Sequence, residues 1–507
     1  MFYEEPAKKL PVSASVDVLV LGAGPAGVAA AISAGRQGAK TMLIEQLGDV
    51  GGIATSGLMS HWTGNTRGGI YEEFLDRSAD LPDSADYGFN GSPRQLINPE
   101  RLKTVFLQML HEAHCEVLLY TFVCEPIMDS GRLSGVIIEN KSGRQAIFAK
   151  IIIDSTGDGD IAAKAGAAYV KGRETDGAMQ PASLMFKIGG VDYSRAVFPG
   201  KFEDYIQIPK GEIQALGKSH LPFPAGHVLL YRSTLPGVVT CNMTNCTGID
   251  GTNAADLSRA VLVCRNQLQP ILDFLHEFVP GYENCYLLET ASLIGIRETR
   301  HFKGLETITE EDIRSSRVFP DWAVTHASFN FDVHNMTGNG LDATGAQDAF
   351  TATSYTIPYG CLVPEKIDGL LLAGRNISGT HMAHANYRVM PICANMGQAA
   401  GIASALSIDG KVKVQNIDLS RLQDKLIDQK ATLMYFKDVD YTSPHFRMVQ
   451  YLGLRGYLPE WTARLQEPVD ATTLAAWKKL SGTDLPGIEA GKTTRLATLE
   501  MIYRKIK

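Results

Sequence analysis

The sequence lacks the features that mark several protein classes. None of its eight cysteines belongs to a Cys-x-x-Cys pair, which argues against a zinc ribbon or a ferredoxin-type iron–sulfur cluster. It contains no apolar run of the roughly 18 residues that a membrane-spanning helix needs. Low-complexity tracts and solenoid repeats are also missing. We therefore expect no membrane span and no repeat architecture.

A basic block is missing as well. The 48 Lys and Arg residues are outnumbered by 55 Asp and Glu residues, which gives a net charge of −7 and argues against nucleic acid as the main partner. The first 15 residues contain charges and two prolines but no apolar signal core. Scattered cysteines in such a chain are typical of buried thiols in a reducing compartment. We expect a cytoplasmic protein.

Glycine, in contrast, is abundant. The 507 residues include 49 glycines, and these gather in clusters rather than at a fixed period. Clustered glycines indicate close backbone approach to a ligand. Hydrophobic residues at 45% and charged residues at 20% are ordinary globular values, which excludes disordered and fibrous proteins. At roughly 150 residues per domain, the length suggests about three structural units.

A dinucleotide-binding pattern opens the chain. Val16–Leu21 is a buried strand pattern, and the sequence Gly-Ala-Gly-Pro-Ala-Gly over 22–27 follows at once and opens a helix rich in small residues. A second strand over 40–44 ends in Glu45, 23 residues after the first glycine. A glycine fingerprint between a strand and a helix, with an acid after the next strand, predicts a βαβ unit that binds a dinucleotide.

Each residue of this pattern has a separate physical role. Gly22 permits the tight turn, Gly24 lets the backbone approach a pyrophosphate, and Gly27 lets the helix press against the sheet. The helix N-terminus offers free N–H groups and a positive dipole to the pyrophosphate. Glu45 is expected to accept hydrogen bonds from the ribose hydroxyls of an adenosine. Pro25 and Ala26 belong to the same turn.

The later strands distinguish an NAD-binding domain from an FAD-binding one. Strands over 151–154 and 369–373 are both expected to return to the first sheet. A domain for nicotinamide alone would be finished by about residue 180. A sheet that is interrupted by a long insertion and completed near the C-terminus is typical of FAD-binding folds of the two-dinucleotide type. We also expect a helix over 99–114, strands near 116–124 and 133–139, and a helix over 391–406.

The combined pattern resembles the FAD-dependent oxidoreductase family, with the flavin subunit of heterodisulfide reductase and the thiazole-biosynthesis proteins as distant kin. The matching stretches are VDVLVLGAGPAGVAAA, IIIDSTGDGD, QPASLMF, GIRETR, IPYGCLVP and LLLAGRNISGTHMAHANYRVMPICANMGQAAG, and the resemblance covers roughly residues 3–408. It implies an α/β fold with an FAD-binding, Rossmann-like domain of the glutathione-reductase type. It does not name a substrate.

The resemblance and the chain layout together suggest a division of the sequence. We expect a split FAD-binding domain over 1–165 and 362–410, an inserted α+β substrate domain over 166–361, and a helical C-terminal region over 411–507. The C-terminal region weakly resembles half of an S-layer homology module. A helical cap on the FAD domain, or a subunit contact in a homo-oligomer, is the alternative that we favour.

The family motifs extend the expected cofactor site. Many FAD enzymes place an acid after the glycine of the last strand, where this chain has Gly374 and Arg375, so a carboxylate contact with the ribityl chain is in doubt. The helix that begins near Pro391 offers free N–H groups to the pyrimidine edge of the flavin. The full expected cofactor set is Gly22, Gly24, Pro25, Ala26, Gly27, Glu45, Gln46, Gly51, Gly52, Thr156, Gly157, Gly374, Arg375, Pro391 and Gly397.

Hydride abstraction from an alcohol or amine needs a base to take the heteroatom proton, and histidine serves well near neutral pH. His384, with Arg388 one turn later, is our first candidate. His61 is the second. His381 is expected to contact the flavin rather than to act as the base.

Other polar residues allow two interpretations each. Arg297 and Arg300 would share a face if helical, and could hold a carboxylate or a polyhydroxylated substrate, or could form an ion pair with Glu298 or another acid of the inserted domain. Asp332 and His334 could share a strand face, where a hydrogen bond is favoured over metal binding because two ligands do not make a site. Cys361 and Cys393 could attach a flavin covalently, but inert burial is favoured. We predict no metal.

The expected function is FAD-dependent oxidation or reduction of a small organic substrate, with hydride transfer to or from flavin N5. One alternative is a flavin-bearing electron-transfer subunit without a substrate of its own. Another is a fumarate-reductase-like or desaturase-like reaction, in which an arginine such as Arg297 donates a proton. A second glycine fingerprint is missing, so the electron donor or acceptor is not indicated by the sequence.

Overall fold

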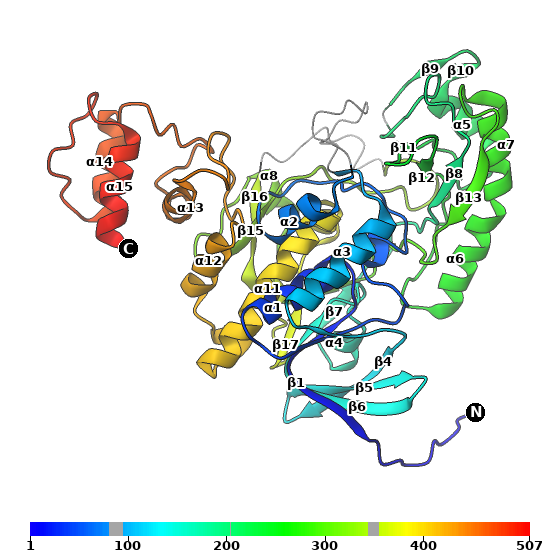
Figure 1. The fold of residues 1–507 in the computed structure, drawn as a ribbon, viewed down its shortest axis with the longest axis horizontal. Helices are drawn as coiled ribbons and strands as arrows, with labels where there is room; N and C mark the ends of the chain where they lie inside the picture. The colour runs from blue at the N-terminus through cyan, green and yellow to red at the C-terminus, as the bar shows by residue number, and fades with distance from the viewer. Residues whose placement is uncertain (81–94, 203, 343–353) are drawn as a thin grey trace.

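The structure is a computed structural model that describes residues 1–80, 95–202, 204–342 and 354–507 (Figure 1). Within these residues, seven strands form the larger sheet, in the order β3-β2-β1-β6-β5-β4, and β17 also pairs with β6. The strands are β1 (Val12–Leu21), β2 (Thr41–Ile44), β3 (Glu116–Leu118), β4 (Phe122–Asp129), β5 (Arg132–Asn140), β6 (Gly143–Asp154) and β17 (Leu370–Leu372).

The centre of this sheet is parallel. β1 pairs in parallel with β2 and β6, β2 with β3, and β6 with β17. In this register Leu21 lies opposite both Ile44 and Asp154, and Leu372 lies opposite Asp154. The apolar, β-branched ends of these strands are almost wholly buried, as expected for a parallel sheet covered on both faces. Four segments that are distant in sequence therefore end side by side at one edge.

β6 pairs with three strands. Its first half pairs antiparallel with β5, which pairs antiparallel with β4, whereas its last residues lie between β1 and β17. The region that the sequence predicted as strands near 116–124 and 133–139 therefore forms three strands, β3, β4 and β5.

Two helices pack closely on the parallel strands. α1 (Pro25–Arg36) contacts α11 (Met390–Gly410) through small residues. A Cβ atom on Gly397 would lie 2.1 Å from the backbone oxygen of Ala26, and one on Gly401 would lie 2.2 Å from that of Ala30. Only glycine permits this approach. The same layer includes α2 (Gly69–Ser78) and α3 (Pro99–Glu112), while α4 (Asp160–Lys164) follows β6.

α11 is preceded by the short helix α10 (His381–Tyr387). Among the described residues, no single helix is long and apolar enough to cross a membrane. The pair α10 and α11 passes that test together, with a bend of 92° between them, and α11 is buried from Met390 to Ser407.

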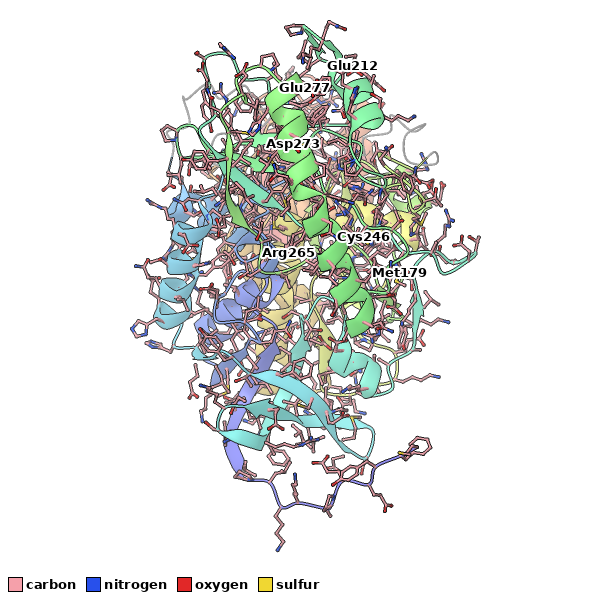
Figure 2. The ribbon with its side chains drawn as sticks, turned by 90° about the vertical axis from the view of Figure 1, so that its right-hand side faces the viewer. Met179, Glu212, Cys246, Arg265, Asp273 and Glu277 are labelled. Carbon is pink, nitrogen blue, oxygen red and sulfur yellow. The ribbon has the colours of Figure 1, made fainter. Side chains whose placement is uncertain are left out.

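A second, antiparallel sheet has its own core. In the described part of the chain, its four strands lie in the order β11-β12-β8-β13. Figure 2 shows the side covered by α6 and α7, where Arg265, Asp273 and Glu277 are exposed. The elements here are β8 (Phe186–Gly189), β9 (Gln207–Ile208), β10 (Gly211–Glu212), α5 (Ile213–His220), β11 (Leu230–Arg232), β12 (Val239–Cys241), α6 (Ala254–Asn266), α7 (Leu268–Phe278) and β13 (Tyr286–Thr290).

Short elements connect the two sheets. They include two strand pairs, β7 with β14 and β15 with β16. Their bounds are β7 (Tyr169–Lys171), β14 (Arg300–Phe302), α8 (Glu310–Arg314), β15 (Ala323–Ala327) and β16 (Tyr355–Pro358), with the 3₁₀ helices η1 (Gly52–Ala54) and η3 (Tyr359–Leu362).

The C-terminal residues are helical and continue the main core. They form η4 (Val414–Asn416), α12 (Leu419–Asp428), α13 (Phe446–Leu454), α14 (Ala471–Ser481) and α15 (Arg495–Ile506). Their buried apolar side chains belong to the same hydrophobic cluster as those of the larger sheet. In Figure 1, α14 and α15 lie at the far end of this extension.

Gln450 is a polar anchor of the C-terminal extension, and we expect Gln450→Met to destabilise the protein by about 1–3 kcal/mol. Its fully buried side chain accepts hydrogen bonds from the N–H groups of Leu433 and Met434 and donates to the oxygen of Met434. Methionine would leave these buried groups unpaired. Thermal or denaturant unfolding measures the change, and the exposed Gln466→Met is the control. Equal stability of the two variants would contradict the prediction.

Candidate functional site

A cavity of about 1230 Å³ lies at the carboxyl edge of the parallel strands. Its wall includes the turn after β1, the end of β2, the segment after β6 and the segment after β17, together with residues from the second sheet. Ligand pockets typically measure roughly 300–1,000 Å³, so this space can hold a molecule larger than an ordinary metabolite.

The turn between β1 and α1 forms one end of the cavity. Gly22 has φ +88°, and a Cβ atom there would lie 2.7 Å from the backbone oxygen of Ser155. A Cβ atom on Gly27 would lie 1.9 Å from the oxygen of Gly22, so both glycines are required by the backbone itself. Gly24 differs, because a Cβ atom on it would meet no described atom within 4 Å. Gly24 faces open space in the cavity.

The N-terminus of α1 is open to an anion. Pro25 occupies the first turn, that turn has no acidic residue, and no described side chain caps the helix. Uncapped N–H groups and the positive end of the helix dipole favour a negatively charged ligand. A pyrophosphate fits this end of the cavity in charge and in hydrogen-bonding character.

Glu45 ties this turn to the end of β2. Its Oε2 accepts a 2.7 Å hydrogen bond from the N–H of Ala23, and its Oε1 accepts a 2.9 Å bond from the N–H of Leu47. Burial raises the pKa of its carboxyl group despite these bonds. Each carboxylate oxygen can accept a second bond, and Glu45 lines the cavity, so it can also receive ligand hydroxyls.

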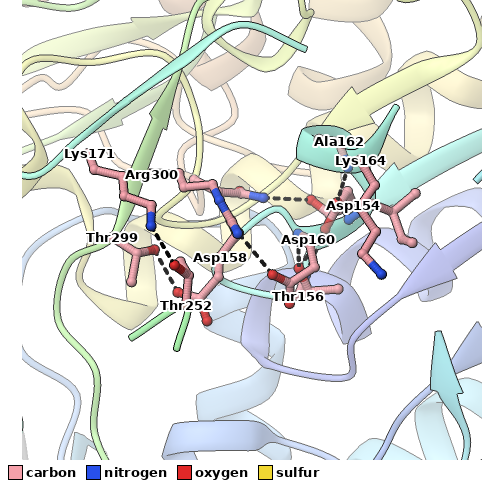
Figure 3. Close-up of polar contacts among 12 residues, drawn as sticks. Asp154, Thr156, Asp158, Asp160, Ala162, Lys164, Lys171, Thr252, Thr299 and Arg300 are labelled. Carbon is pink, nitrogen blue, oxygen red and sulfur yellow. Dashed lines mark hydrogen bonds and ion pairs between the residues drawn. The ribbon is translucent and has the colours of Figure 1, made fainter. Parts of the chain in front are cut away.

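The segment after β6 is organised by Asp154. Its Oδ2 accepts bonds from the N–H groups of Ile161 and Ala162, and its Oδ1 accepts from the N–H and hydroxyl of Thr156 (Figure 3). The side chain thus holds the turn that carries Thr156 and Gly157 against the start of α4. Both residues line the cavity.

An acidic pair neutralises two arginines beside this turn. Asp158 Oδ1 accepts 2.6 Å bonds from Arg375 Nη2 and from the hydroxyl of Thr299. Arg300 donates 2.8 Å bonds to Asp160 Oδ1 and to the backbone oxygen of Asp158 (Figure 3). Segments 295–300 and 374–375, distant in sequence, therefore meet at the cavity wall.

Another part of the cavity wall has a compact charged group. Arg388 donates 2.9 Å bonds to the backbone oxygen and to Oδ2 of Asp332, and His334 Nε2 lies 3.5 Å from the same Oδ2. Arg297 donates from Nη1 to the oxygen of Pro181 at 2.6 Å and to Ser183 Oγ at 3.0 Å. All four charged or titratable side chains line the cavity.

A family model described as FAD dependent oxidoreductase matches residues 17–426, a span that contains the strand ends and turns just described. The chain belongs to the FAD-dependent oxidoreductase family. The family, the FAD-binding Rossmann-like fold and the cofactor FAD predicted from the sequence are confirmed, and the protein is an FAD-dependent oxidoreductase enzyme.

Comparison with solved structures finds matches at low sequence identity. A geranylgeranyl bacteriochlorophyll reductase-like protein from Thermoplasma acidophilum is 13% identical, with a TM-score of 0.42, and the match covers 97% of this chain and 96% of that chain. The flavin-dependent brominase Bmp2 is 12% identical, with a TM-score of 0.42 and coverage of 82% and 83%. THI4 from Thermovibrio ammonificans is 20% identical, with a TM-score of 0.26 and coverage of 32% and 67%.

Comparison with curated proteins finds no significant match. The substrate of this FAD-dependent oxidoreductase therefore has to be argued from the site itself.

Most of the residues that the sequence predicted for this FAD-dependent oxidoreductase line one cavity. Those on its wall are His61, Arg297, Arg300 and Arg388 among the catalytic candidates, and Gly22, Gly24, Pro25, Ala26, Glu45, Gln46, Gly52, Thr156, Gly157, Gly374 and Arg375 among the cofactor candidates. Gly27, Gly51, Pro391 and Gly397 are not among the described lining residues. Gly27 and Gly397 instead make the close backbone contacts of α1, and Gly51 donates its N–H to the oxygen of Ala23.

His384, our first candidate for the base, is not among the described residues that line the cavity. It is 1% exposed and contacts the ring of His301 edge to face, with 4.7 Å between the ring centroids. Burial holds its pKa well below the ordinary value.

His384 belongs to a buried group centred on Glu298. Glu298 Oε1 accepts bonds from His301 Nε2 at 2.8 Å and His381 Nδ1 at 2.6 Å, and its Oε2 accepts from the N–H of Gln180 at 3.1 Å. Glu298, His301 and His384 offer ligand atoms within 4.8 Å of one another, but the carboxylate is already bonded to protein donors. The carboxylate is thus satisfied by protein donors, whereas Nδ1 of His301 and Nδ1 of His384 are buried without a hydrogen-bond partner among the described residues.

The segment 295–300 is not helical, in contrast to the arrangement in which Arg297 and Arg300 would share a face. Residues 296–299 have no regular structure and Arg300 begins β14, so Arg297 and Arg300 do not share a helix face. Arg300 pairs with Asp160 rather than with Glu298, whose partners are histidines. Arg297 instead donates its hydrogen bonds to neutral groups, the backbone oxygen of Pro181 and the hydroxyl of Ser183.

The two cysteines near the cavity differ in position. Cys393 lines it, but its thiol donates to the backbone oxygen of Arg388, and burial raises its pKa to about 12. Cys361 is fully buried, and burial raises its pKa further. Both thiols are therefore protonated and unreactive near neutral pH.

The sequence analysis did not predict that residues within 200–242 line the cavity. Tyr231 and Asn242 line the cavity beside Arg297 and His61, and the Tyr231 ring lies 3.8 Å from that of His61. Burial lowers the pKa of His61 to about 3. These residues carry no motif in the sequence, and Tyr231 lies in the short strand β11 while Asn242 directly follows β12.

Proposed function

We propose that FAD lies extended in this cavity, with its diphosphate at the N-terminus of α1 and its adenosine ribose at Glu45. The open space at Gly24 and the uncapped helix support the diphosphate position. The flavin then extends toward the N-terminus of α11, where Val389, Met390 and Cys393 line the cavity and no described side chain caps the helix. The free N–H groups there suit the electron-rich edge of a reduced flavin.

The same cavity also contains a reaction site for a small organic substrate. The single observation that supports this assignment is continuity: one space reaches from the turn at Gly24 to Arg297, Asp332 and His334. A flavin placed as above would end beside these polar groups. When bound, FAD supplies the two-electron acceptor or donor at N5.

His334 is the proton acceptor in the oxidative direction. Asp332 Oδ2 lies 3.5 Å from its Nε2 and is itself held by Arg388, so the imidazole has a fixed orienting partner. His334 would take the proton of the substrate's hydroxyl or amine. With FAD bound, the C–H bond would break with its electron pair leaving as hydride to the cofactor, the O–H or N–H bond would break with its proton going to His334, and the C=O or C=N bond would form.

Anaerobic bleaching of the bound flavin tests this function. The purified holoenzyme is mixed without oxygen with a panel of small alcohols, amines, hydroxy acids and sugars, and the flavin absorbance is followed. We expect at least one substrate to bleach the flavin within seconds, because typical enzymes turn over at 1–1,000 per second. If no member bleaches it, while a redox protein exchanges electrons with it, the role is electron transfer and the proposal is wrong.

A further inference from the structure

We infer that the substrate carries a carboxylate, which binds Arg297 on the wall of the cavity. This inference rests on the proposed function and adds the chemical class of the substrate. The sequence alone left three roles open for Arg297: binding a carboxylate, binding a polyhydroxylated substrate, or an ion pair within the protein. The distribution of charge on the cavity wall separates them.

Three of the four arginines on the wall already have a carboxylate. Arg388 pairs with Asp332 at 2.9 Å, Arg300 with Asp160 at 2.8 Å, and Arg375 with Asp158 at 2.6 Å. Arg297 has no carboxylate within ion-pair distance among the described residues. Its hydrogen bonds go to Pro181 and Ser183, both neutral, and both use Nη1.

The neighbour that could neutralise Arg297 is engaged elsewhere. Glu298 follows it in sequence, but its side chain is fully buried and bonded to His301, His381 and the backbone of Gln180. Asp332 is shared by Arg388 and His334. The region around Arg297 therefore has one positive charge in excess.

This excess charge is only partly exposed, and protein surrounds most of it. Burial and the nearby Arg388 lower the pKa of Arg297 to about 10, which leaves its guanidinium charged at neutral pH. A charge removed from water and left without a counterion is unfavourable, so an anionic ligand gains the interaction that the protein does not provide. A polyol would leave the charge uncompensated.

The geometry of a guanidinium also favours a carboxylate. With Nη1 fixed by Pro181 and Ser183, the remaining N–H groups of Arg297 can form the two parallel bonds that a carboxylate accepts. His334 lies on the same wall, and Arg297 is one of the charges that lower its pKa. A carboxylate on Arg297 would thus orient the neighbouring carbon toward the proton acceptor.

Titration of the holoenzyme with matched pairs of ligands tests the inference. Lactate and lactamide, benzoate and benzamide, and succinate and succinamide differ mainly in charge, and binding is read from the perturbed flavin spectrum. We expect at least one carboxylate to bind about 10- to 100-fold more tightly than its amide, the range that a charge-assisted hydrogen bond gives. Equal affinities, or no binding by any carboxylate, would overturn the inference.

Variants test whether the preference for a carboxylate depends on Arg297. Arg297→Met should abolish the discrimination between acid and amide, whereas the exposed Arg265→Met should keep it. If Arg297→Met loses FAD or melts early, Ser183→Ala, which removes one bond that orients Arg297, should reduce the discrimination in a folded holoenzyme. Undiminished discrimination in whichever variant folds contradicts the inference.

Binding of carboxylates tests the anion site at Arg297, whereas bleaching of the flavin tests the proposed hydride transfer. Arg297-dependent binding of carboxylates without flavin reduction by any substrate would retain the anion site and reject the proposed hydride transfer. Flavin reduction by neutral substrates alone, unaffected by Arg297→Met, would retain the hydride transfer and reject the carboxylate.

Discussion

His334→Asn is expected to slow flavin reduction by the substrate about 100- to 10,000-fold while FAD stays bound, the range that removal of a general base gives. His334 lies on the cavity wall and is oriented by Asp332, which is held in turn by Arg388. Asparagine keeps a polar side chain of similar reach but cannot accept the proton at neutral pH. Stopped-flow absorbance under anaerobic conditions measures the rate, and the FAD content of the variant is measured in parallel.

Two other histidines serve as matched controls. His384→Asn changes a buried imidazole outside the described cavity lining, and His61→Asn changes one on the wall that stacks on Tyr231. We expect the reduction rate to fall far less in both than in His334→Asn. A large loss in His384→Asn with a folded, FAD-loaded protein would restore our original candidate and reject His334.

The pH dependence of the flavin reduction rate gives an independent check that His334 is the base. Burial and the nearby Arg297 lower the pKa of His334 to about 4, so the imidazole is neutral and able to accept a proton above that pH. The rate at low substrate concentration should therefore fall as the pH drops through about 4, rather than through the ordinary histidine value near 6.5. The low-pH limb should be missing in His334→Asn.

Gly24→Ala is expected to abolish retention of FAD while leaving the apoprotein folded. Its Cβ would meet no described protein atom within 4 Å, so the fold has room for it, but it would occupy the space where the backbone approaches the diphosphate. The variant should purify colourless and melt near the temperature of wild-type apoprotein. Absorbance of the flavin bands and thermal unfolding measure the two effects.

Gly27→Ala is the matched contrast. Here the Cβ would lie 1.9 Å from the backbone oxygen of Gly22, which no side-chain movement can relieve. We expect this variant to be destabilised by about 1–3 kcal/mol or more even without cofactor, since overpacking forces the backbone to shift. If Gly24→Ala retains FAD at wild-type affinity, the proposed diphosphate position is wrong.

The βαβ unit could be predicted from the sequence because its signals are local. The strand at Val16–Leu21, the glycine spacing and Glu45 follow one another within about 30 residues, and each constrains its own backbone. The helix over 99–114 and the strand over 369–373 were likewise visible as periodic or continuous apolar runs, and they correspond to α3 and β17.

The substrate end of the site could not be predicted in the same way. His384 follows the last parallel strand closely, which made it the natural candidate, but α10 turns its side chain toward Glu298 and His301. Asp332 and His334 seemed an ordinary surface pair, and Tyr231 carries no motif. Their common position on one wall depends on where the second sheet packs.

The sequence by itself determined the family, the cofactor and the residues of the β1–α1 turn, because short-range backbone geometry dictates glycine there whatever surrounds it. Only the tertiary structure decided which arginine lacks a counterion and which histidine reaches the cavity. Those properties depend on contacts between segments more than 100 residues apart, such as the 2.6 Å bond from Arg297 to Pro181. Charge compensation and burial are properties of the packed neighbourhood, and no single segment of the chain encodes them.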